Sequence, residues 1–221
     1  MSMTTLAEAE QYDAWYDSRR GRWIGDTEYR LLCRHLDLQP GQQVLDVGCG
    51  TGWFTRRLAQ AGLAMTGLDA DEDMLAVARQ RTPAGIPWLQ GDAARLPFAD
   101  RSFDQVVAIT SLCFVPDWPQ AVAEIVRVAR RRFVLGLLNR HSLLWRDKGQ
   151  AGGSGAYRGA HWHTRGELAA CLRQLAVRNV RFATAVSLPS GTPWAQTLER
   201  LLPDSWPWGS FLLASGEIAE L

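Results

Sequence analysis

Residues 44–52 read Val-Leu-Asp-Val-Gly-Cys-Gly-Thr-Gly, a short apolar run that leads into three closely spaced glycines. The apolar run fits a buried strand, and residues 53–61 after it fit a helix with apolar side chains on one face. A strand that turns through glycines into a helix lets the backbone approach a ligand closely and presents free N–H groups at the helix start. The stretch therefore predicts a ligand-binding turn.

Outward from this turn, short apolar runs alternate with amphipathic runs along the chain. Strands are expected at 43–47, 64–69, 88–91, 104–109 and 132–138, and helices at 53–61, from 71 onward and at 120–129. Alternation at this spacing predicts βαβ units and a mostly parallel sheet with helices on both faces. Right-handed crossovers then make the fold class α/β with a doubly wound sheet.

The last third of the chain is organised differently. Residues 139–163 are rich in glycine without a clear period, and residues 189–209 are rich in Pro and Trp. We expect both stretches to be lid or cap insertions. Thr164 and Glu167 form a capping box that begins a helix. Two more strands are expected at 180–188 and 210–214, with a short helix at 195–202 between them.

The composition is that of an ordinary soluble globular chain, with 221 residues, 47% of them hydrophobic and 21% charged. We expect a single domain over 1–221, with residues 1–35 as an N-terminal helical cap. The formal net charge of +1 lacks the basic field of most nucleic-acid binders. Accordingly, the run Arg130–Arg132 is interpreted as a solvated helix end and not as an RNA-binding patch.

Neither a membrane span nor a secretion signal is predicted. No apolar run approaches the roughly 18 residues that a spanning helix needs. The first residues lack a basic start followed by an apolar core. The four cysteines are far apart, which disfavours a zinc ribbon or a disulfide framework. We therefore expect a cytoplasmic protein.

Carboxylates stand near the ends of three successive strands. Asp46 precedes the glycines and suits a cationic ligand better than a pyrophosphate. Trp53 replaces the third glycine of the dinucleotide-binding pattern, which disfavours an NAD-linked enzyme. Asp69 ends the second strand, where it can accept hydrogen bonds from both ribose hydroxyls, and Asp92 follows the third, where it can accept from an adenine amine. An adenosine moiety is thus predicted along the carboxyl edge of the sheet.

With these residues, the chain resembles the class I S-adenosylmethionine-dependent methyltransferases related to the ubiquinone- and menaquinone-biosynthesis enzymes. The resemblance rests on VLDVGCGTG (44–52), GLDAD (67–71), GDAARLPF (91–98) and FDQVVAITSLCFVPD (103–117), and it covers about residues 10–135. It implies a Rossmann-like, seven-stranded, mostly parallel sheet with an antiparallel last strand. The chain departs from the family in lacking a Lys-Pro-Gly-Gly turn before the fifth strand, where Ala129 and the arginines stand instead.

The same resemblance implies the residues that would hold S-adenosylmethionine and its product, S-adenosylhomocysteine. The expected set is Tyr16, Asp46, Gly48, Cys49, Gly50, Gly52, Asp69, Ala70, Asp92, Ala93, Ser111 and Leu112. The glycine turn would lie under the methionyl part, while Ser111 and Leu112 would lie near the methyl group. Tyr12 and Tyr16 resemble the family's leading helix, whose aromatic rings close over the cofactor. The alternative for this segment is an amphipathic helix that packs on the sheet.

Methyl transfer from a sulfonium requires alignment of donor and acceptor and exclusion of water more than acid–base chemistry. We expect direct in-line transfer to a small-molecule acceptor held by the cap and lid segments of a monomer or homodimer. The acceptor and the atom methylated are not determined by the sequence. The alternatives are a methyltransferase that acts on RNA or protein, and a non-catalytic protein that binds S-adenosylmethionine.

No catalytic residue and no metal site are assigned from the sequence. His161 and His163 are the best-placed candidates for a general base, although histidines in a surface loop commonly have no such role. Cys113 is expected to be a buried thiol and not a nucleophile.

Overall fold

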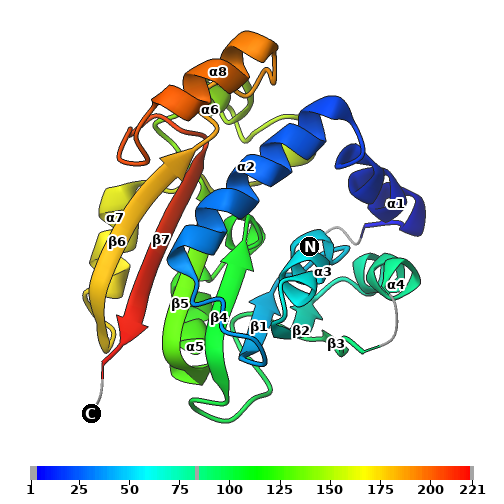
Figure 1. Cartoon of the computed structure of the whole chain (residues 1–221), viewed down its shortest axis with the longest axis vertical. Coiled ribbons are helices and arrows are strands. Elements are labelled where there is room, and N and C mark those ends of the chain that lie inside the picture. Colours follow the sequence, from blue (N-terminus) through cyan, green and yellow to red (C-terminus); the bar gives the residue numbers. More distant parts are fainter. Residues whose placement is uncertain (1–3, 83–84, 220–221) are drawn as a thin grey trace.

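The computed structural model describes residues 4–82 and 85–219, so residues 1–3 of the expected cap and residues 220–221 of the expected domain lie outside the described residues. Its centre is a seven-stranded sheet in the order β3-β2-β1-β4-β5-β7-β6 (Figure 1). The strands are Gln43–Val47 (β1), Ala64–Asp69 (β2), Trp88–Gln90 (β3), Phe103–Ile109 (β4), Ala129–Leu138 (β5), Val177–Ala185 (β6) and Phe211–Ile218 (β7). The first five are parallel, and β7 runs antiparallel to β5 and β6. The predicted sheet is confirmed.

Helices cover both faces of this sheet. They are Leu6–Trp15 (α1), Arg19–His35 (α2), Trp53–Gln60 (α3), Glu72–Arg81 (α4), Trp118–Val128 (α5), Leu143–Lys148 (α6), Arg165–Leu172 (α7) and Pro193–Leu201 (α8), with 3-10 turns at Leu112–Phe114 (η1) and Gly155–Tyr157 (η2). Along β4, Val106 and Ala108 join the core beneath α5 and α7, while Val107 and Ile109 join the core beneath α2 and α3. Because both faces are buried, the central strands read as nearly continuous apolar runs.

The boundaries of three strands differ from the sequence-based expectation by three residues or more, and those of β3 and β4 differ by one residue. β5 begins at Ala129, so Arg130–Arg132 belong to a strand, and their interpretation as a helix end is wrong. Phe103 of β4 pairs with Ala129, and this pairing extends β5 toward solvent at the amino-terminal edge of the sheet. β6 and β7 pair with each other over 177–185 and 211–218, and this pairing sets their ends at positions shifted from those predicted.

The helices of the expected cap and lid segments lie near one end of the molecule. Figure 1 shows α6 and α8 at the end toward which β4 points, with α1 beside it. Residues 139–163, where no regular element was expected, contain α6 and η2. The Ser142 hydroxyl begins α6 by accepting the Trp145 N–H at 3.1 Å. These segments therefore lie at the carboxyl edge, where a ligand is predicted.

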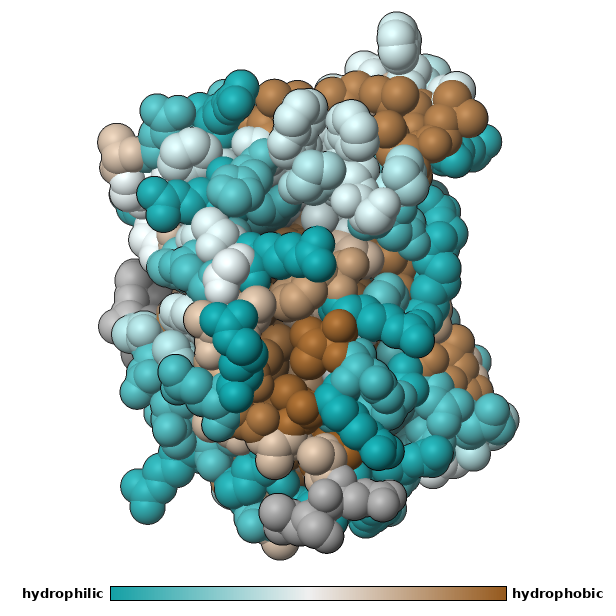
Figure 2. All heavy atoms as spheres, turned by 90° about the vertical axis from the view of Figure 1, so that its left-hand side faces the viewer, coloured by the Kyte–Doolittle hydropathy of each residue, from teal (hydrophilic) through white to brown (hydrophobic). Residues whose placement is uncertain are grey.

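No helix within the described ranges is long and apolar enough to cross a membrane. Figure 2 shows the face that carries the edge strand β6; hydrophilic side chains cover most of it, and apolar ones gather at its centre and upper end. A bulge between Arg178 and Arg181 interrupts β6. Charged side chains and a bulge are devices that protect an edge strand from pairing with another chain.

Candidate cofactor site

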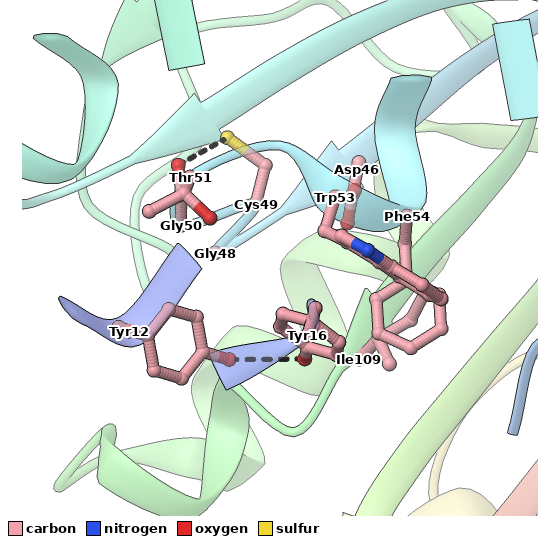
Figure 3. Close-up of a pocket in the computed structure, with 10 residues that line it drawn as sticks. All are labelled: Tyr12, Tyr16, Asp46, Gly48, Cys49, Gly50, Thr51, Trp53, Phe54 and Ile109. Carbon is pink, nitrogen blue, oxygen red and sulfur yellow. Dashed lines mark hydrogen bonds between the residues drawn. The ribbon is translucent and has the colours of Figure 1, made fainter. Parts of the chain in front are cut away.

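The glycine turn borders a cavity between β1, the start of α3 and the tyrosines at the end of α1. The cavity has about 300 Å³ of unfilled space. It is lined by Tyr12, Tyr16, Asp46, Gly48, Cys49, Gly50, Thr51, Trp53, Phe54 and Ile109 (Figure 3). Five of the predicted site residues are therefore brought together here, with Tyr12. From the sequence, Phe54 and Ile109 are only apolar residues expected to face the core, and this character does not indicate a ligand contact.

Position 48 requires a glycine both because of its backbone conformation and because there is no space for a Cβ. Its φ is +71°, and a Cβ at this position would lie 2.6 Å from the Oγ of Ser111 and closer still to the Ser111 Cβ. Ser111 is fixed there because its hydroxyl donates a hydrogen bond of 2.7 Å to the Val47 carbonyl. The end of β4 thus lies directly against the turn, with no room for a side chain between them.

Gly52 and Thr51 complete the turn in different ways. Gly52 is buried, has a φ of +78°, and would place a Cβ 3.0 Å from the Cζ3 of Trp88. It lies outside the cavity lining, so its contact with a ligand remains a prediction. Thr51 lines the cavity, and its buried hydroxyl has no hydrogen-bond partner among the described residues. An orphaned hydroxyl of this kind fits a polar ligand in the cavity.

Asp69 is held against the turn by backbone donors. Its Oδ2 accepts the Gly50 N–H at 2.7 Å and its Oδ1 accepts the Asp71 N–H at 2.9 Å. Burial raises the pKa of Asp69, and the backbone hydrogen bonds offset part of that effect. Each carboxylate oxygen keeps a further lone pair, so the side chain can still accept hydrogen bonds from ligand hydroxyls.

Asp46 is a buried carboxylate with one hydrogen-bond donor. It is 2% exposed, and its Oδ2 accepts the Thr55 hydroxyl at 2.6 Å. Burial raises the pKa of Asp46 to about 7, against the lowering effect of the Thr55 hydroxyl. A poorly hydrated carboxylate of this kind favours a nearby cation. Thr55 was not predicted, because nothing in the sequence shows that its side chain reaches back to β1.

Aromatic rings close one side of the cavity. The Tyr16 ring stacks on Trp53 with centroids 4.4 Å apart and planes 16° apart, and its hydroxyl lies 3.3 Å from that of Tyr12 (Figure 3). A Cβ on Gly25 of α2 would lie 2.7 Å from the Trp53 ring, so this glycine lets α2 pack closely on the pair. Trp53, which replaces the dinucleotide-type glycine, therefore supports the aromatic cap.

An ion-pair network fastens α1 to the rest of the molecule. Asp13 of α1 is 6% exposed and lies 3.1 Å from Arg56 of α3 and 3.3 Å from Arg81 of α4. Removal of one partner from such a buried pair is usually strongly destabilising. The network holds the tyrosine-bearing helix above the glycine turn.

The residues predicted to hold the adenine lie outside the cavity lining, as does Leu112, which was predicted to lie near the methyl group. Ala70 and Asp92 are exposed after the neighbouring strands β2 and β3, and Asp92 accepts the Ala94 N–H at 2.9 Å. Ala93 is 9% exposed, and Leu112 is fully buried in the core. The strand ends are arranged as predicted, whereas ligand contacts for these four residues remain predictions.

The two histidine candidates lie beside η1 and not in the cavity. The His161 N–H donates to the Cys113 carbonyl at 2.7 Å, and the His163 N–H donates to the Leu138 carbonyl at 2.8 Å. His163 is fully buried, neither ring nitrogen has a partner among the described residues, and burial lowers its pKa to about 4. His161 is partly exposed and lies 3.4 Å from Glu167. Neither histidine lines the cavity. A role of either one as a general base therefore remains a prediction.

Two other sequence-based expectations concern Cys113 and metal ligands. Cys113 is 1% exposed, and burial raises its pKa to about 12, so the predicted buried thiol is confirmed. Within the described part of the chain, no three His, Cys, Asp or Glu side chains are grouped so that they could hold a metal ion.

Glu28 is a candidate that sequence reasoning missed. It lies almost one helical turn after Gly25 on α2, and no described residue donates a hydrogen bond to its carboxylate. Burial raises the pKa of Glu28 to about 8. Burial also raises the pKa of Tyr12, Tyr16 and Tyr157, and the Glu28 carboxylate raises each of them further. Glu28 is therefore close enough to interact with phenols from α1 and η2. In sequence it is one charge among many in a polar helix.

Comparison with known proteins relates this geometry to sequence. Residues 45–134 match the family described as a methyltransferase domain. A demethylmenaquinone methyltransferase of Renibacterium salmoninarum is 43% identical over 101 residues, which are 46% of this chain and 42% of that protein. A malonyl-[acyl-carrier protein] O-methyltransferase of Serratia marcescens is 42% identical over 91 residues, 41% of this chain and 35% of that protein. The chain thus spans less than half the length of these curated relatives.

Solved structures share the fold over nearly the whole chain. An S-adenosylmethionine-dependent methyltransferase of Thermotoga maritima, described as a possible histamine N-methyltransferase, aligns with a TM-score of 0.76 at 24% identity, covering 96% of this chain and 97% of that one. Phosphoethanolamine N-methyltransferase 2 of Haemonchus contortus, in complex with S-adenosylmethionine, aligns with a TM-score of 0.73 at 17% identity, covering 98% and 58%. Residues 45–134 of this chain are thus similar to the methyltransferase-domain family, and the chain has the fold of solved S-adenosylmethionine-dependent methyltransferases.

Proposed function

We propose that this protein transfers the methyl group of S-adenosylmethionine to a small-molecule acceptor by direct in-line displacement. The observation that carries the proposal is the placement of Asp46 and Asp69 beside the glycine turn, under the stacked Tyr16 and Trp53 rings. Asp69 offers acceptor oxygens for ribose hydroxyls, and the buried Asp46 offers negative charge to a cationic donor. The orphaned Thr51 hydroxyl and the side-chain-free turn at Gly48 fit a ligand with polar groups.

When bound, S-adenosylmethionine supplies an activated methyl group that leaves neutral S-adenosylhomocysteine behind. The chain's own residues then have to align two reactants and exclude water. Asp69 and the Gly50 N–H that it accepts fix the position of the turn. Ser111, held by Val47, fixes the end of β4 against it. Rigid positioning of this kind can contribute several kcal/mol to a displacement reaction, about 7–11 kcal/mol in the best cases.

The acceptor is expected to enter between the N-terminal cap and the lid segment 139–163. The Glu28 carboxylate raises the pKa of the Tyr12, Tyr16 and Tyr157 phenols, and this supports a set of polar groups from α1, α2 and η2 on the acceptor side. One curated relative is named for demethylmenaquinone as its acceptor, and this supports a small molecule as the acceptor here.

Transfer of a labelled methyl group tests the proposal. The full chain is incubated with methyl-tritiated S-adenosylmethionine and a cell extract that is separated into small-molecule, RNA and protein fractions. We expect label in the small-molecule fraction, and none with Asp69→Ala. Label that appears only in RNA or in protein would contradict the small-molecule acceptor. Tight cofactor binding without label in any fraction would instead identify a non-catalytic binder.

A further inference from the structure

The amino-terminal edge of the sheet carries a second cleft, at the opposite ends of the strands from the glycine turn. It has about 810 Å³ of unfilled space, part of it open to solvent. Five arginines line it, namely Arg101, Arg130, Arg131, Arg132 and Arg178. They come from the turn before β4, the start of β5 and the start of β6. Three of them, Arg130–Arg132, form the run that was predicted from the sequence to be a solvated helix end.

Positive charge exceeds negative charge in this cleft. Against the five arginines, the lining contains two carboxylates, those of Asp37 and Glu217. Among the described lining residues the excess is three positive charges, or two when Asp104, which pairs with Arg130, is included; the formal net charge of the whole chain is +1. A concave surface with such an excess attracts anions.

The carboxylates hold most of these arginines loosely. Arg131 lies 3.7 Å from Asp37, whereas Arg132 and Arg178 share Glu217 at 3.6 and 3.4 Å. Solvent-exposed ion pairs at such distances contribute little to stability. Arg132 also donates to the His35 carbonyl at 3.0 Å, so Arg131 and Arg178 are the two of these that can turn toward a ligand at small cost.

The remaining two arginines differ from each other. Arg130 makes the one short ion pair of the group, 2.7 Å from Asp104. Arg101 lies 3.5 Å from the Ala219 carbonyl, and no carboxylate within residues 4–82 and 85–219 is within ion-pair distance of it. Arg101 is thus the arginine with most hydrogen-bonding capacity left for an anion.

Irregular backbone shapes this edge of the sheet. Arg101 has a φ of +53°, a left-handed conformation that non-glycine residues rarely adopt, and its N–H donates to the Arg127 carbonyl at 2.9 Å. Bulges interrupt the pairing between Phe103 and Gln105 and, in β6, between Arg178 and Arg181. Bulges redirect neighbouring side chains and often occur beside functional sites.

Gln105 makes the inner wall of the cleft rigid. Its side chain is 1% exposed, donates to the Asp37 carbonyl at 2.7 Å and accepts the Asp37 N–H at 2.9 Å. The arginines therefore project from ordered strands and from a wall that is internally hydrogen-bonded.

We propose that this cleft binds a small ligand with a diphosphate or triphosphate group. Guanidinium groups match phosphate oxygens through paired hydrogen bonds, which makes arginine the preferred side chain for such groups. A chain of two or three phosphates matches an excess of two or three positive charges better than a single carboxylate does. A single-stranded nucleic acid is commonly held by aromatic stacking platforms, and no aromatic residue of the described ranges lines this cleft.

Calorimetric titration of the full chain with pyrophosphate and with inorganic triphosphate tests this proposal. We expect both to bind, and the double variant Arg101→Ala/Arg131→Ala to bind at least about 30-fold more weakly, because each arginine supplies charge-assisted hydrogen bonds. Arg173→Ala, an exposed arginine at the end of α7, is the matched control and should leave the affinity unchanged. Unchanged binding of S-adenosylmethionine shows that each variant is folded.

Three results would overturn the proposal. The first is no binding of either phosphate compound by the folded protein at millimolar concentration. The second is an equal loss of affinity in Arg173→Ala, which would mean that only general charge matters. The third is tighter binding of a single-stranded RNA oligonucleotide than of triphosphate at the same phosphate concentration, which would identify the cleft as a nucleic-acid surface.

Discussion

The two edges of this sheet carry opposite chemistry, although β4 contributes to both sites. At the carboxyl edge, Asp46 and Asp69 stand beside the glycine turn, and aromatic rings close one side of the cavity there. At the amino edge, Arg101 and Arg131 stand in an open cleft. Because β1 to β5 are parallel, the segments that follow these strands collect at one edge and those that precede them collect at the other. A few residues beyond each strand end therefore determine the charge of each site.

The edges also differ in how firmly their charges are held. Asp46 is 2% exposed, and Asp69 accepts two backbone N–H groups. By contrast, the side chain of Arg131 is 59% exposed and lies 3.7 Å from its carboxylate partner. Charges in a poorly hydrated site interact more strongly than exposed ones. Changes at the carboxyl edge should accordingly have the larger effects.

The largest effect is expected from Gly48→Ala, with Gly41→Ala as the matched control. Both glycines have a positive φ, but a Cβ on Gly41 would meet nothing within 4 Å, whereas one on Gly48 would overlap Ser111. Gly41→Ala should lower the free energy of unfolding by about 1 kcal/mol, and Gly48→Ala by about 3 kcal/mol, because overpacking adds to the conformational cost. Urea unfolding measures both values. Equal losses would show that Ser111 does not restrict the turn.

Loss of S-adenosylmethionine binding should accompany Gly48→Ala and not Gly41→Ala. Titration calorimetry on the folded variants separates this effect from stability. If Gly48→Ala binds the cofactor normally, the turn is not the binding site.

The next largest effect is expected from Glu28→Gln. We predict a fall of about 10–100-fold in methyl transfer to the labelled acceptor, because a carboxylate that positions the acceptor or takes its proton is removed. Affinity for S-adenosylmethionine should change by less than about twofold, since Glu28 lies outside the cavity lining. Glu10→Gln, at an exposed position of α1, is the control. A parallel loss of cofactor affinity would place Glu28 in the cofactor site instead.

An effect of about one order of magnitude is expected from pH. The pKa of Asp46 is about 7 in the folded state, above its ordinary value of 3.8. The contribution of Asp46 to stability is therefore full below pH 3.8 and is lost as pH rises through 7. A bound cation favours the ionised form, so affinity for S-adenosylmethionine should rise about tenfold from pH 6 to pH 8. Calorimetry at several pH values measures this rise, and Asp46→Asn should remove it. A pH-independent affinity would contradict the role of Asp46.

The smallest effect tests the separation of the two edges. Arg131→Ala should change affinity for S-adenosylmethionine by less than about twofold, because exposed charges at opposite ends of a strand are screened by salt. The reciprocal change, Asp69→Ala, should leave pyrophosphate binding equally unaffected. A coupled loss in either direction would mean that the sheet transmits binding from one edge to the other.

The sequence predicted the parts of the molecule that local patterns encode. The order of strands along the chain, the glycine turn and the place of Asp69 follow from periodicity and spacing, and the structure places Asp69 against Gly50. The bounds of β5, β6 and β7 do not, because strand pairing sets them. Contacts that depend on tertiary packing could not be predicted. Thr55 reaches back to Asp46 across a turn, and Glu28 comes near Tyr157 only after the cap and lid segments pack together.

The arginine run is a second feature that could not be predicted because it depends on tertiary pairing. Arg130–Arg132 look like a charged helix end because α5 precedes them directly. Pairing of Ala129 with Phe103 makes them the start of β5, and a charged surface run becomes one wall of a cleft. Residues from four other segments complete that cleft, and the order of the strands in the sheet brings them together.

Calorimetric titration with S-adenosylmethionine, S-adenosylhomocysteine and NAD, on the natural chain and on Asp69→Ala, tests the central claim most directly. We predict that the first two ligands bind and NAD does not. Asp69→Ala should weaken both by at least about 100-fold, because charge-assisted hydrogen bonds to the ribose are lost. Binding of NAD as tight as that of S-adenosylmethionine, or unchanged binding by Asp69→Ala, would contradict the assignment of this edge to the methyl donor.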